Sequence, residues 1–314
     1  MSESNPSEGL RGREHRLSGT IILGVPIVLV VITFLFWYQT WFGRRLSDSD
    51  LREYLLDTSV PHKTQHALTQ VAAEILRHDA SVERVYPLVA SLADNKEAGF
   101  RSMAAWVMGQ DNKSASFHQA LLKLVNDPEP VVRWNAALAL ARFGDPAGDP
   151  QLKLMLRPYN LLAPMAGAIS YSVIDSDAVR NGTIVARIKT QDSDPVEVRS
   201  PLAGVVQKQV VVDGATIAAG DEIAVISPAE QQVWQALRAL YLVGQPEDLG
   251  DVDRFARTVE GMSDRVRQQA VLTAGAIRKR TTGTTKKSDN QGRMAEANRE
   301  SRMAPDKGRT IKNP

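Results

Sequence analysis

Few residues in the sequence could do chemistry by their type and spacing, and a pair of histidines is the first candidate. His62 and His66 stand four residues apart, so a helix would bring both imidazoles within reach of one metal ion. No glutamate partner and no third ligand motif accompanies them. The solvated start of a helix is therefore the preferred interpretation over a metal site.

Four aspartates form the second candidate, because carboxylate pairs can do acid–base chemistry or bind calcium. They are Asp175, Asp177, Asp192 and Asp194. The glycine and the terminal glutamate of a calcium-binding loop are missing, and Asp-Ser-Asp is also a common turn sequence. Turns are the favoured interpretation, so the sequence predicts no metal site here.

The sequence also lacks the residues that several other kinds of chemistry require. The chain has no cysteine, which excludes thiolate metal sites and cysteine nucleophiles, and it has no glycine-rich phosphate-binding motif. Trp106, Trp134 and Trp234 are expected to lie in the core on apolar helix faces, not to bind a cofactor. We therefore assign no catalytic, cofactor-binding or metal-binding residue, and we expect a protein that is not an enzyme, has no cofactor and has no small-molecule substrate.

Length and composition indicate a globular protein of about two domains. The chain has 314 residues, of which 43% are hydrophobic and 24% are charged. The net charge of +2 conceals a basic end, because residues 278–314 hold 11 basic and 4 acidic residues. This segment is expected to be a disordered basic tail. It could contact anionic lipid or nucleic acid, or it could be a solubilising extension.

A long apolar segment near the start of the chain has the properties of a membrane span. Residues 17–43 contain no charged side chain, and Trp37, Tyr38 and Trp41 lie at one end, where aromatic rings prefer the membrane interface. About 20 apolar residues in a helix cross a hydrocarbon core of roughly 30 Å. The sequence predicts a transmembrane helix over residues 19–42.

The alternative of a cleaved signal peptide fits this segment less well. Its apolar stretch is too long, and no small-residue cleavage site follows it. We expect an uncleaved single-pass anchor in a bacterial inner membrane, preceded by a tail over residues 1–18. Three arginines flank each side of the span, so its orientation is open. Arg44, Arg45 and the basic tail favour a cytoplasmic body slightly.

The rest of the chain is mostly helical by its apolar spacing, and it contains an internal repeat. Arg101–Gly109 and Arg133–Ala141 are similar, with an offset of 32 residues, and Arg267–Gly275 is a third copy. The helices expected before these three copies are Val85–Ala93, Phe117–Val125 and Val252–Val259. Small residues in the second helix of each pair allow stacked pairs to approach closely.

These repeats resemble HEAT repeats. The resemblance rests on Asp-Pro-x-Pro-Val-Val-Arg, which begins at Asp127, on the Ala-Ala-x-x-Leu that follows it, and on the similar core at Arg101. It covers residues 82–145 well and residues 231–277 weakly; a plain helical bundle is the alternative. The family implies a scaffold for protein–protein contacts and carries no chemistry.

Residues 158–228 have a different pattern, with β-branched runs and glycines arranged in two similar halves. The halves are offset by 37 residues at Gly167 and Gly204, and by 38 at Gly182 and Gly220. Gly167 and Gly204 fit positions of close backbone approach or positive φ, and the other two fit tight turns. The repeat predicts a small closed β-sandwich with pseudo-twofold symmetry.

This repeat resembles the biotinyl/lipoyl-like fold, a barrel-sandwich hybrid also found in membrane-fusion (periplasmic adaptor) proteins. The resemblance implies a modified lysine at the tip of the hairpin that joins the halves, eight residues before the proline of the second half. Ser193 stands at that place, and Lys189 comes too early. We therefore expect no attached cofactor, and the linking segment is too short for the helical hairpin of pump adaptors.

The expected fold is mainly α with a β insertion: an N-terminal transmembrane helix, then a HEAT-like α-solenoid interrupted by a lipoyl-like β-sandwich. Its parts would be HEAT-like helices over 47–157, the β module over 158–228 and resumed helices over 229–277. The expected function is a membrane-anchored scaffold that binds protein partners and assembles or stabilises a membrane complex. A transport adaptor related to membrane-fusion proteins is the alternative, and an atypical covalent carrier modified at Lys189 or Lys208 is a third.

Overall fold

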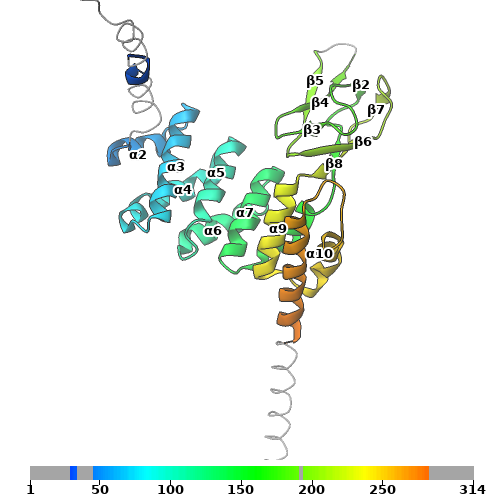
Figure 1. Ribbon diagram of the computed structural model, residues 1–314. Helices are drawn as coiled ribbons and strands as arrows, with labels where there is room; N and C mark the ends of the chain where they lie inside the picture. The colour runs from blue at the N-terminus through cyan, green and yellow to red at the C-terminus, as the bar shows by residue number, and fades with distance from the viewer. Residues whose placement is uncertain (1–28, 34–44, 191–193, 283–314) are drawn as a thin grey trace, which may run out of the picture. The chain divides into compact units, whose positions relative to one another are not determined.

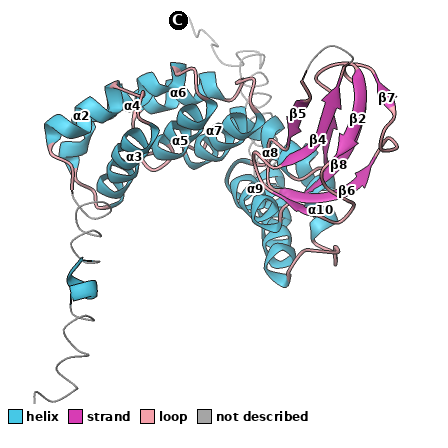
Figure 2. Ribbon diagram, turned by 90° about the horizontal axis from the view of Figure 1, so that it is seen from above, coloured by secondary structure: helices cyan, strands magenta, loops and turns pink. Residues whose placement is uncertain are grey.

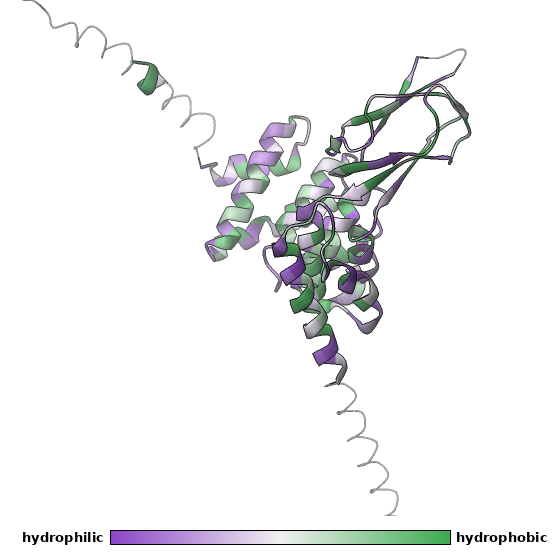
Figure 3. Ribbon diagram, turned by 45° about the vertical axis from the view of Figure 1, so that its right-hand side comes forward, coloured by the Kyte–Doolittle hydropathy of each residue, from purple (hydrophilic) through white to green (hydrophobic). Residues whose placement is uncertain are grey.

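The computed structural model describes residues 29–33, 45–190 and 194–282 (Figure 1), in two compact units that divide at Asp50 and Leu51. In the first unit, residues 29–33 are helical, and Figure 3 colours them as hydrophobic. Among the described residues, no helix combines the length and the apolar character that a membrane crossing requires. Apart from residues 29–33, the span predicted over 19–42 lies outside the described residues, so the anchor stays a prediction.

The second unit contains helical pairs, each with a first helix and a longer second helix. The second helices α3 (Pro61–Leu76), α5 (Ala98–Met108), α7 (Pro130–Arg142) and α9 (Glu230–Val243) lie side by side in this order (Figure 2). A further second helix spans residues 264–282. The first helices, several with 3-10 turns, are α2 (Asp48–Leu56, of which residues from Leu51 on belong to this unit), η1 (Ala80–Val85) with α4 (Tyr86–Ser91) and η2 (Leu92–Asp94), α6 (Ala115–Leu124), η3 (Pro146–Gly148) with α8 (Asp149–Met155), and η4 (Pro246–Asp248) with α10 (Leu249–Phe255).

Local sequence signals start these helices. Pro61 and Pro130 stand at the first helical position, where a missing N–H costs nothing and the fixed φ suits the helix. The Ser114 hydroxyl accepts a hydrogen bond from the Phe117 N–H at the start of α6. Hydrophobic and hydrophilic residues alternate along the helices in Figure 3, as expected of amphipathic helices.

Small residues allow the second helices to pack closely, as the sequence predicts. Ala104 and Ala105 of α5 and Ala136 of α7 are fully buried. A Cβ atom at Gly109 would lie only 2.8 Å from the Cβ of Ala139, so a larger residue at this crossing would force α5 and α7 apart. The close approach therefore depends on side-chain size and not only on apolar character.

The helical segment ends later than the sequence suggests. The basic tail is predicted from residue 278, but the last helix continues to residue 282. Arg278 pairs with Asp253 of α10 at 2.7 Å, and Arg280 donates to the carbonyl oxygens of Tyr241 and Gly244. Arg278 thus neutralises a carboxylate, and Arg280 donates hydrogen bonds to carbonyl oxygens at the C-terminal end of α9. These contacts explain why the helix continues through basic residues here. Residues 283–314 lie outside the described residues.

Residues 159–228 form two antiparallel four-stranded sheets, with the orders β1-β8-β6-β3 and β5-β4-β2-β7. The strands are β1 (Tyr159–Leu162), β2 (Gly167–Tyr171), β3 (Ala178–Val179), β4 (Ile184–Lys189), β5 (Val196–Arg199), β6 (Gly204–Gln209), β7 (Thr216–Ile217) and β8 (Glu222–Pro228). Exchanging β1–β4 with β5–β8 converts one order into the other. Each sheet therefore contains strands of both halves, and neither half can form its sheet alone.

The predicted pseudo-twofold repeat is also visible in single hydrogen bonds. The Gln209 N–H donates to Asp175 at 2.7 Å, and the Tyr171 N–H donates to Asp213 at 2.8 Å, which is the same bond shifted by 38 residues. A core of Ile169, Val185, Ile188, Ile223 and Ala224, each at most 1% exposed, closes the space between the sheets. The two halves are therefore equivalent in their contacts as well as in their sequence.

The four glycines have the roles that the repeat predicts. Gly182 and Gly220 have φ of +85° and +89° in turns, where a side chain would be strained. A Cβ atom at Gly167 would lie 2.7 Å from the Ile188 side chain, and one at Gly204 would lie 2.7 Å from the Ile226 side chain. The last two positions are points of close approach between paired strands.

The β region lies between the first and second helix of one pair. In sequence α8 precedes it and α9 follows it, yet α9 packs against both α7 and α8. The Gln232 side chain of α9 donates to the Met155 carbonyl oxygen of α8 at 3.0 Å. The third copy at Arg267 is therefore not the next second helix of the stack, because α9 occupies that place.

Removal of residues 158–228, with a short glycine–serine linker in their place, is expected to leave a cooperatively folded helical protein. The reason is that α8 and α9 contact each other directly. Thermal unfolding followed by circular dichroism in the helical band checks this. A second deletion that extends through Val243 removes α9 as well and is expected to lose cooperativity. Loss of cooperativity in the first deletion would contradict the arrangement.

Candidate protein-interaction surface

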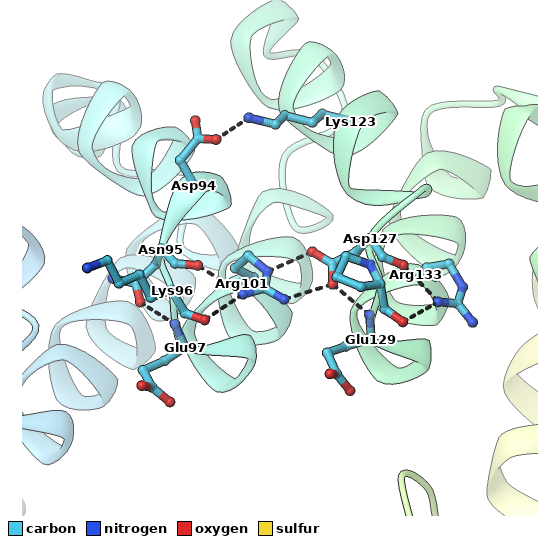
Figure 4. Close-up of polar contacts among 10 residues, drawn as sticks. Asp94, Asn95, Lys96, Glu97, Arg101, Lys123, Asp127, Glu129 and Arg133 are labelled. Carbon is cyan, nitrogen blue, oxygen red and sulfur yellow. Dashed lines mark hydrogen bonds and ion pairs between the residues drawn. The ribbon is translucent and has the colours of Figure 1, made fainter. Parts of the chain in front are cut away.

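A ladder of polar contacts joins successive helical pairs and fixes the position of their second helices (Figure 4). Arg101 of α5 forms a two-point ion pair with Asp127, with Nε to Oδ2 at 2.6 Å and Nη2 to Oδ1 at 2.8 Å. Its Nη1 also donates to the carbonyl oxygens of Asn95 and Lys96, both at 2.9 Å. One guanidinium therefore holds the turn of its own pair and the turn of the next.

Arg133 of α7 repeats this arrangement 32 residues later. Its Nη1 donates to the carbonyl oxygens of Asp127 and Pro128 at 2.7 and 2.8 Å, and its Nε donates to Gln151 of α8 at 3.2 Å. The arginines that define the sequence repeat thus cap the turn before their own helix. Arg267 of the third copy pairs instead with Asp264 in its own helix, at 2.9 Å.

The ion pair between Arg101 and Asp127 is almost completely buried. The two side chains are 11% and 6% exposed. Burial acts to raise the pKa of Asp127, but hydrogen bonds from Arg101 and from the Glu129 N–H outweigh it, so the pKa lies below its usual value. The carboxylate therefore stays ionised and remains a fixed acceptor between two pairs.

Helices α5, α7 and α9 form a groove of about 300 Å³ on one face of the stack. The lining positions are one helical turn apart and recur on successive helices, so one face of each contributes. They are Trp106, Gly109 and Gln110 at α5, Asn135, Leu138, Ala139 and Arg142 on α7, and Gln235, Arg238, Ala239 and Leu242 on α9. Because α9 follows the β region, the groove combines residues from both sides of the insertion.

The three tryptophans differ in burial, and the prediction that all of them lie in the core is wrong for Trp106. Trp134 is 7% exposed, as expected of a core residue, but Trp106 is 45% exposed and lines the groove. Trp234 is half-buried, with the guanidinium of Arg265 3.5 Å and that of Arg238 4.7 Å from its ring centre. Trp106 does not belong to the core, because its side chain lines the exposed groove.

The charged side chains that line the groove are both basic. Arg142 and Arg238 are exposed, and Arg142 donates to the Gln110 side-chain oxygen at 2.9 Å. Among residues 45–190 and 194–282, neither arginine has an ion-pair partner. The groove therefore combines apolar side chains, amides and uncompensated positive charge.

The candidates for chemistry from the sequence are not brought together. His62 is exposed and His66 is half-buried, and the described part of the chain contains no group of metal-ligating side chains. Asp177 accepts a hydrogen bond from the Ile174 N–H, which is the predicted turn role. Lys189 and Lys208 are exposed on strands. Asp192 and Ser193 at the hairpin tip lie outside the described residues.

A buried carboxylate pair, which the sequence analysis did not identify, lies between α8 and η4. Asp149 begins α8 and Asp248 ends η4; Lys153 pairs with them at 3.3 and 3.1 Å. Asp248 is fully buried and accepts the Gln245 N–H at 2.6 Å. Burial raises the pKa of Asp149 to about 6, and the hydrogen bond to Asp248 and the charge of Asp248 add to this.

Replacement of Asp149 by asparagine is expected to stabilise the protein at neutral pH. The raised pKa means that the folded state holds the proton of Asp149 more tightly than the unfolded state does. The stability that the protonated Asp149 contributes is fully present below about pH 4 and is lost as the pH rises through 6. An asparagine side chain stays neutral and can still donate to Asp248, so unfolding should cost about 1–2 kcal/mol more at pH 7.5 and about the same at pH 4.

Urea unfolding of both proteins at several pH values measures this difference. Asp248→Asn is the control, because Asp248 also caps η4 and pairs with Lys153, so its loss is expected to destabilise. A stability difference between D149N and the parent that does not change with pH would contradict the assignment.

Comparison with known families gives a match over the helices that carry this ladder. Residues 85–160 match a family described as HEAT repeats. The matched segment begins in η1 and ends in β1, so it includes α4 to α8 with Arg101, Asp127 and Arg133. A search of curated proteins found no match. HEAT repeats are generally scaffolds for protein interaction, and this part of the chain contains them.

Proposed function

We propose that this protein is a membrane-anchored, non-catalytic scaffold that binds protein partners and assembles or stabilises a membrane complex. The observation that carries the proposal is the stack of second helices in and beyond the HEAT match, with an exposed groove across three of them. The charge-free segment at residues 17–43 supports the anchor. We propose a single-pass protein of a bacterial inner membrane; Arg44, Arg45 and the basic tail favour a cytoplasmic body slightly over a periplasmic one.

The β region has a structural role in this proposal. Its two equivalent halves support the resemblance to the biotinyl/lipoyl-like fold. Ser193 stands at the place of the modified lysine, so we propose a rigid element without an attached cofactor. Its insertion between α8 and α9 would present a second surface at a fixed point of the array.

A transport adaptor is the second candidate, and the same pseudo-twofold β region favours it. Membrane-fusion proteins use this fold on the outer side of the inner membrane, so this candidate requires a periplasmic body. A reporter fused after Ile277 separates the two. Alkaline phosphatase activity would support the adaptor, and fluorescence from a protein that folds only in the cytoplasm would support the scaffold and exclude the adaptor.

Site-specific photo-crosslinking in cells tests the scaffold itself. A photoreactive amino acid placed at exposed Leu242 or Trp106 in the groove is expected to give discrete protein adducts. The same is expected at exposed positions elsewhere on the helical array, such as Leu76. Val212, 80% exposed in the β region, is the comparison position. Absence of adducts from every array position would refute the scaffold. Extraction of the full chain by alkaline carbonate would refute the membrane anchor alone.

A further inference from the structure

We infer that the groove across α5, α7 and α9 binds an acidic peptide segment that carries an apolar anchor residue. This inference rests on the proposed scaffold function and specifies the chemistry of its partner. The charges that line the groove, Arg142 and Arg238, are both positive, and neither forms an ion pair in the described part of the chain. Their natural complement is a pair of carboxylates on the occupant.

The size and lining of the groove favour a peptide over other anions. At about 300 Å³ it is at the lower end of ligand pockets, which is enough for one or two side chains. Its floor includes the small residues Gly109, Ala139 and Ala239. Two arginines are too few for the phosphate contacts that dominate nucleic-acid affinity. An apolar residue of the partner would insert here while neighbouring carboxylates contact the arginines.

Trp106 and Leu242 are the expected apolar contacts for the anchor residue of the peptide. They are 45% and 51% exposed, and both line this one groove. Burial of an aromatic side chain at the centre of a peptide interface commonly supplies much of its affinity. The amides of Gln110, Asn135 and Gln235 can bond to peptide groups beside this contact.

Selection from a displayed library of random peptides of about twelve residues, with the full chain in detergent as target, tests the inference. Enriched peptides are expected to share at least two acidic residues beside one aromatic or aliphatic residue. Their dissociation constant is expected to rise roughly 30-fold with Arg142→Glu and Arg238→Glu together, and about tenfold with Trp106→Ala. Raising NaCl from about 50 to about 500 mM should weaken binding several-fold.

Arg52→Glu with Arg257→Glu is the matched control. Both arginines are exposed outside the groove, and the pair changes the net charge equally. Failure to enrich peptides, enrichment without acidic residues, or affinities that the groove variants leave unchanged would each overturn the inference. So would preferential binding of anionic vesicles or an RNA oligonucleotide at the same arginines. If photo-crosslinks at Leu76 persist in any of these cases, the scaffold function stands and only the acidic-peptide site fails.

Discussion

Replacement of Arg101 by alanine is expected to lower the free energy of unfolding by about 3 kcal/mol. The change leaves the Asp127 carboxylate, 6% exposed, without its charge partner. It also removes the donors to the Asn95 and Lys96 carbonyl oxygens, so the turn before α5 loses its cap. Urea unfolding at pH 7 measures the loss.

Two further variants separate the buried pair from ordinary surface charge. Lys123→Ala removes an ion pair with Asp94 that joins the same two helical pairs, but those side chains are 62% and 69% exposed. We expect a loss below about 0.5 kcal/mol there. Asp127→Asn keeps the oxygen that accepts the Glu129 N–H, as Asn95 does for Glu97 in the preceding turn. If Arg101→Ala lowered the free energy of unfolding as little as Lys123→Ala does, the ladder would not hold the array together.

The ion pair between Arg101 and Asp127 also makes the free energy of unfolding depend on pH. The pKa of Asp127 is lowered on folding, so the stabilising contribution is present above about pH 4 and is lost as the pH falls through the lower folded value. The difference between the parent and Arg101→Ala should therefore shrink in acid. The dependence is opposite in sign to that of Asp149, whose stabilising contribution is lost as the pH rises.

How far the sequence predicts the fold depends on whether a feature is local or repeated. The two β halves are predictable because the repeat places Gly167 and Gly204 in equivalent environments, and a single sequence contains both copies. The arginines at 101 and 133 are predictable for the same reason. Asp127 belongs to the same motif, but its pairing with Arg101 cannot be predicted from the sequence, since a contact between pairs leaves no periodic signal.

Contacts across the β insertion cannot be predicted in this way. Asp149 and Asp248 are about 100 residues apart, and their pairing depends on α8 meeting the helices that follow the β region. The groove has the same origin, because α9 supplies Arg238. Trp106 shows the other difficulty: apolar spacing places it on a helix face, but only the packing determines which face meets the first helices.

Replacement of Gly204 by alanine is expected to destabilise the β region by about 3 kcal/mol without changing the helical array. A Cβ atom there would overlap the carbonyl oxygen of Ser227 on β8 and lie 2.7 Å from the Ile226 side chain. Strands β6 and β8 would have to separate, because a backbone oxygen cannot move independently of its strand. Hydrogen exchange followed by mass spectrometry measures the effect in each part of the chain.

Exchange is expected to accelerate in peptides from residues 159–228 and to stay unchanged in peptides from α5 and α7. Gly167→Ala, the equivalent change in the other half, should give a similar profile, since its Cβ would lie 2.7 Å from Ile188 and from the Lys189 carbonyl oxygen. Gly250→Ala in α10 is the control, because nothing lies within 4 Å of its Cβ position and alanine favours a helix. Equal acceleration in both parts of the chain would show that the β region and the array unfold as one unit.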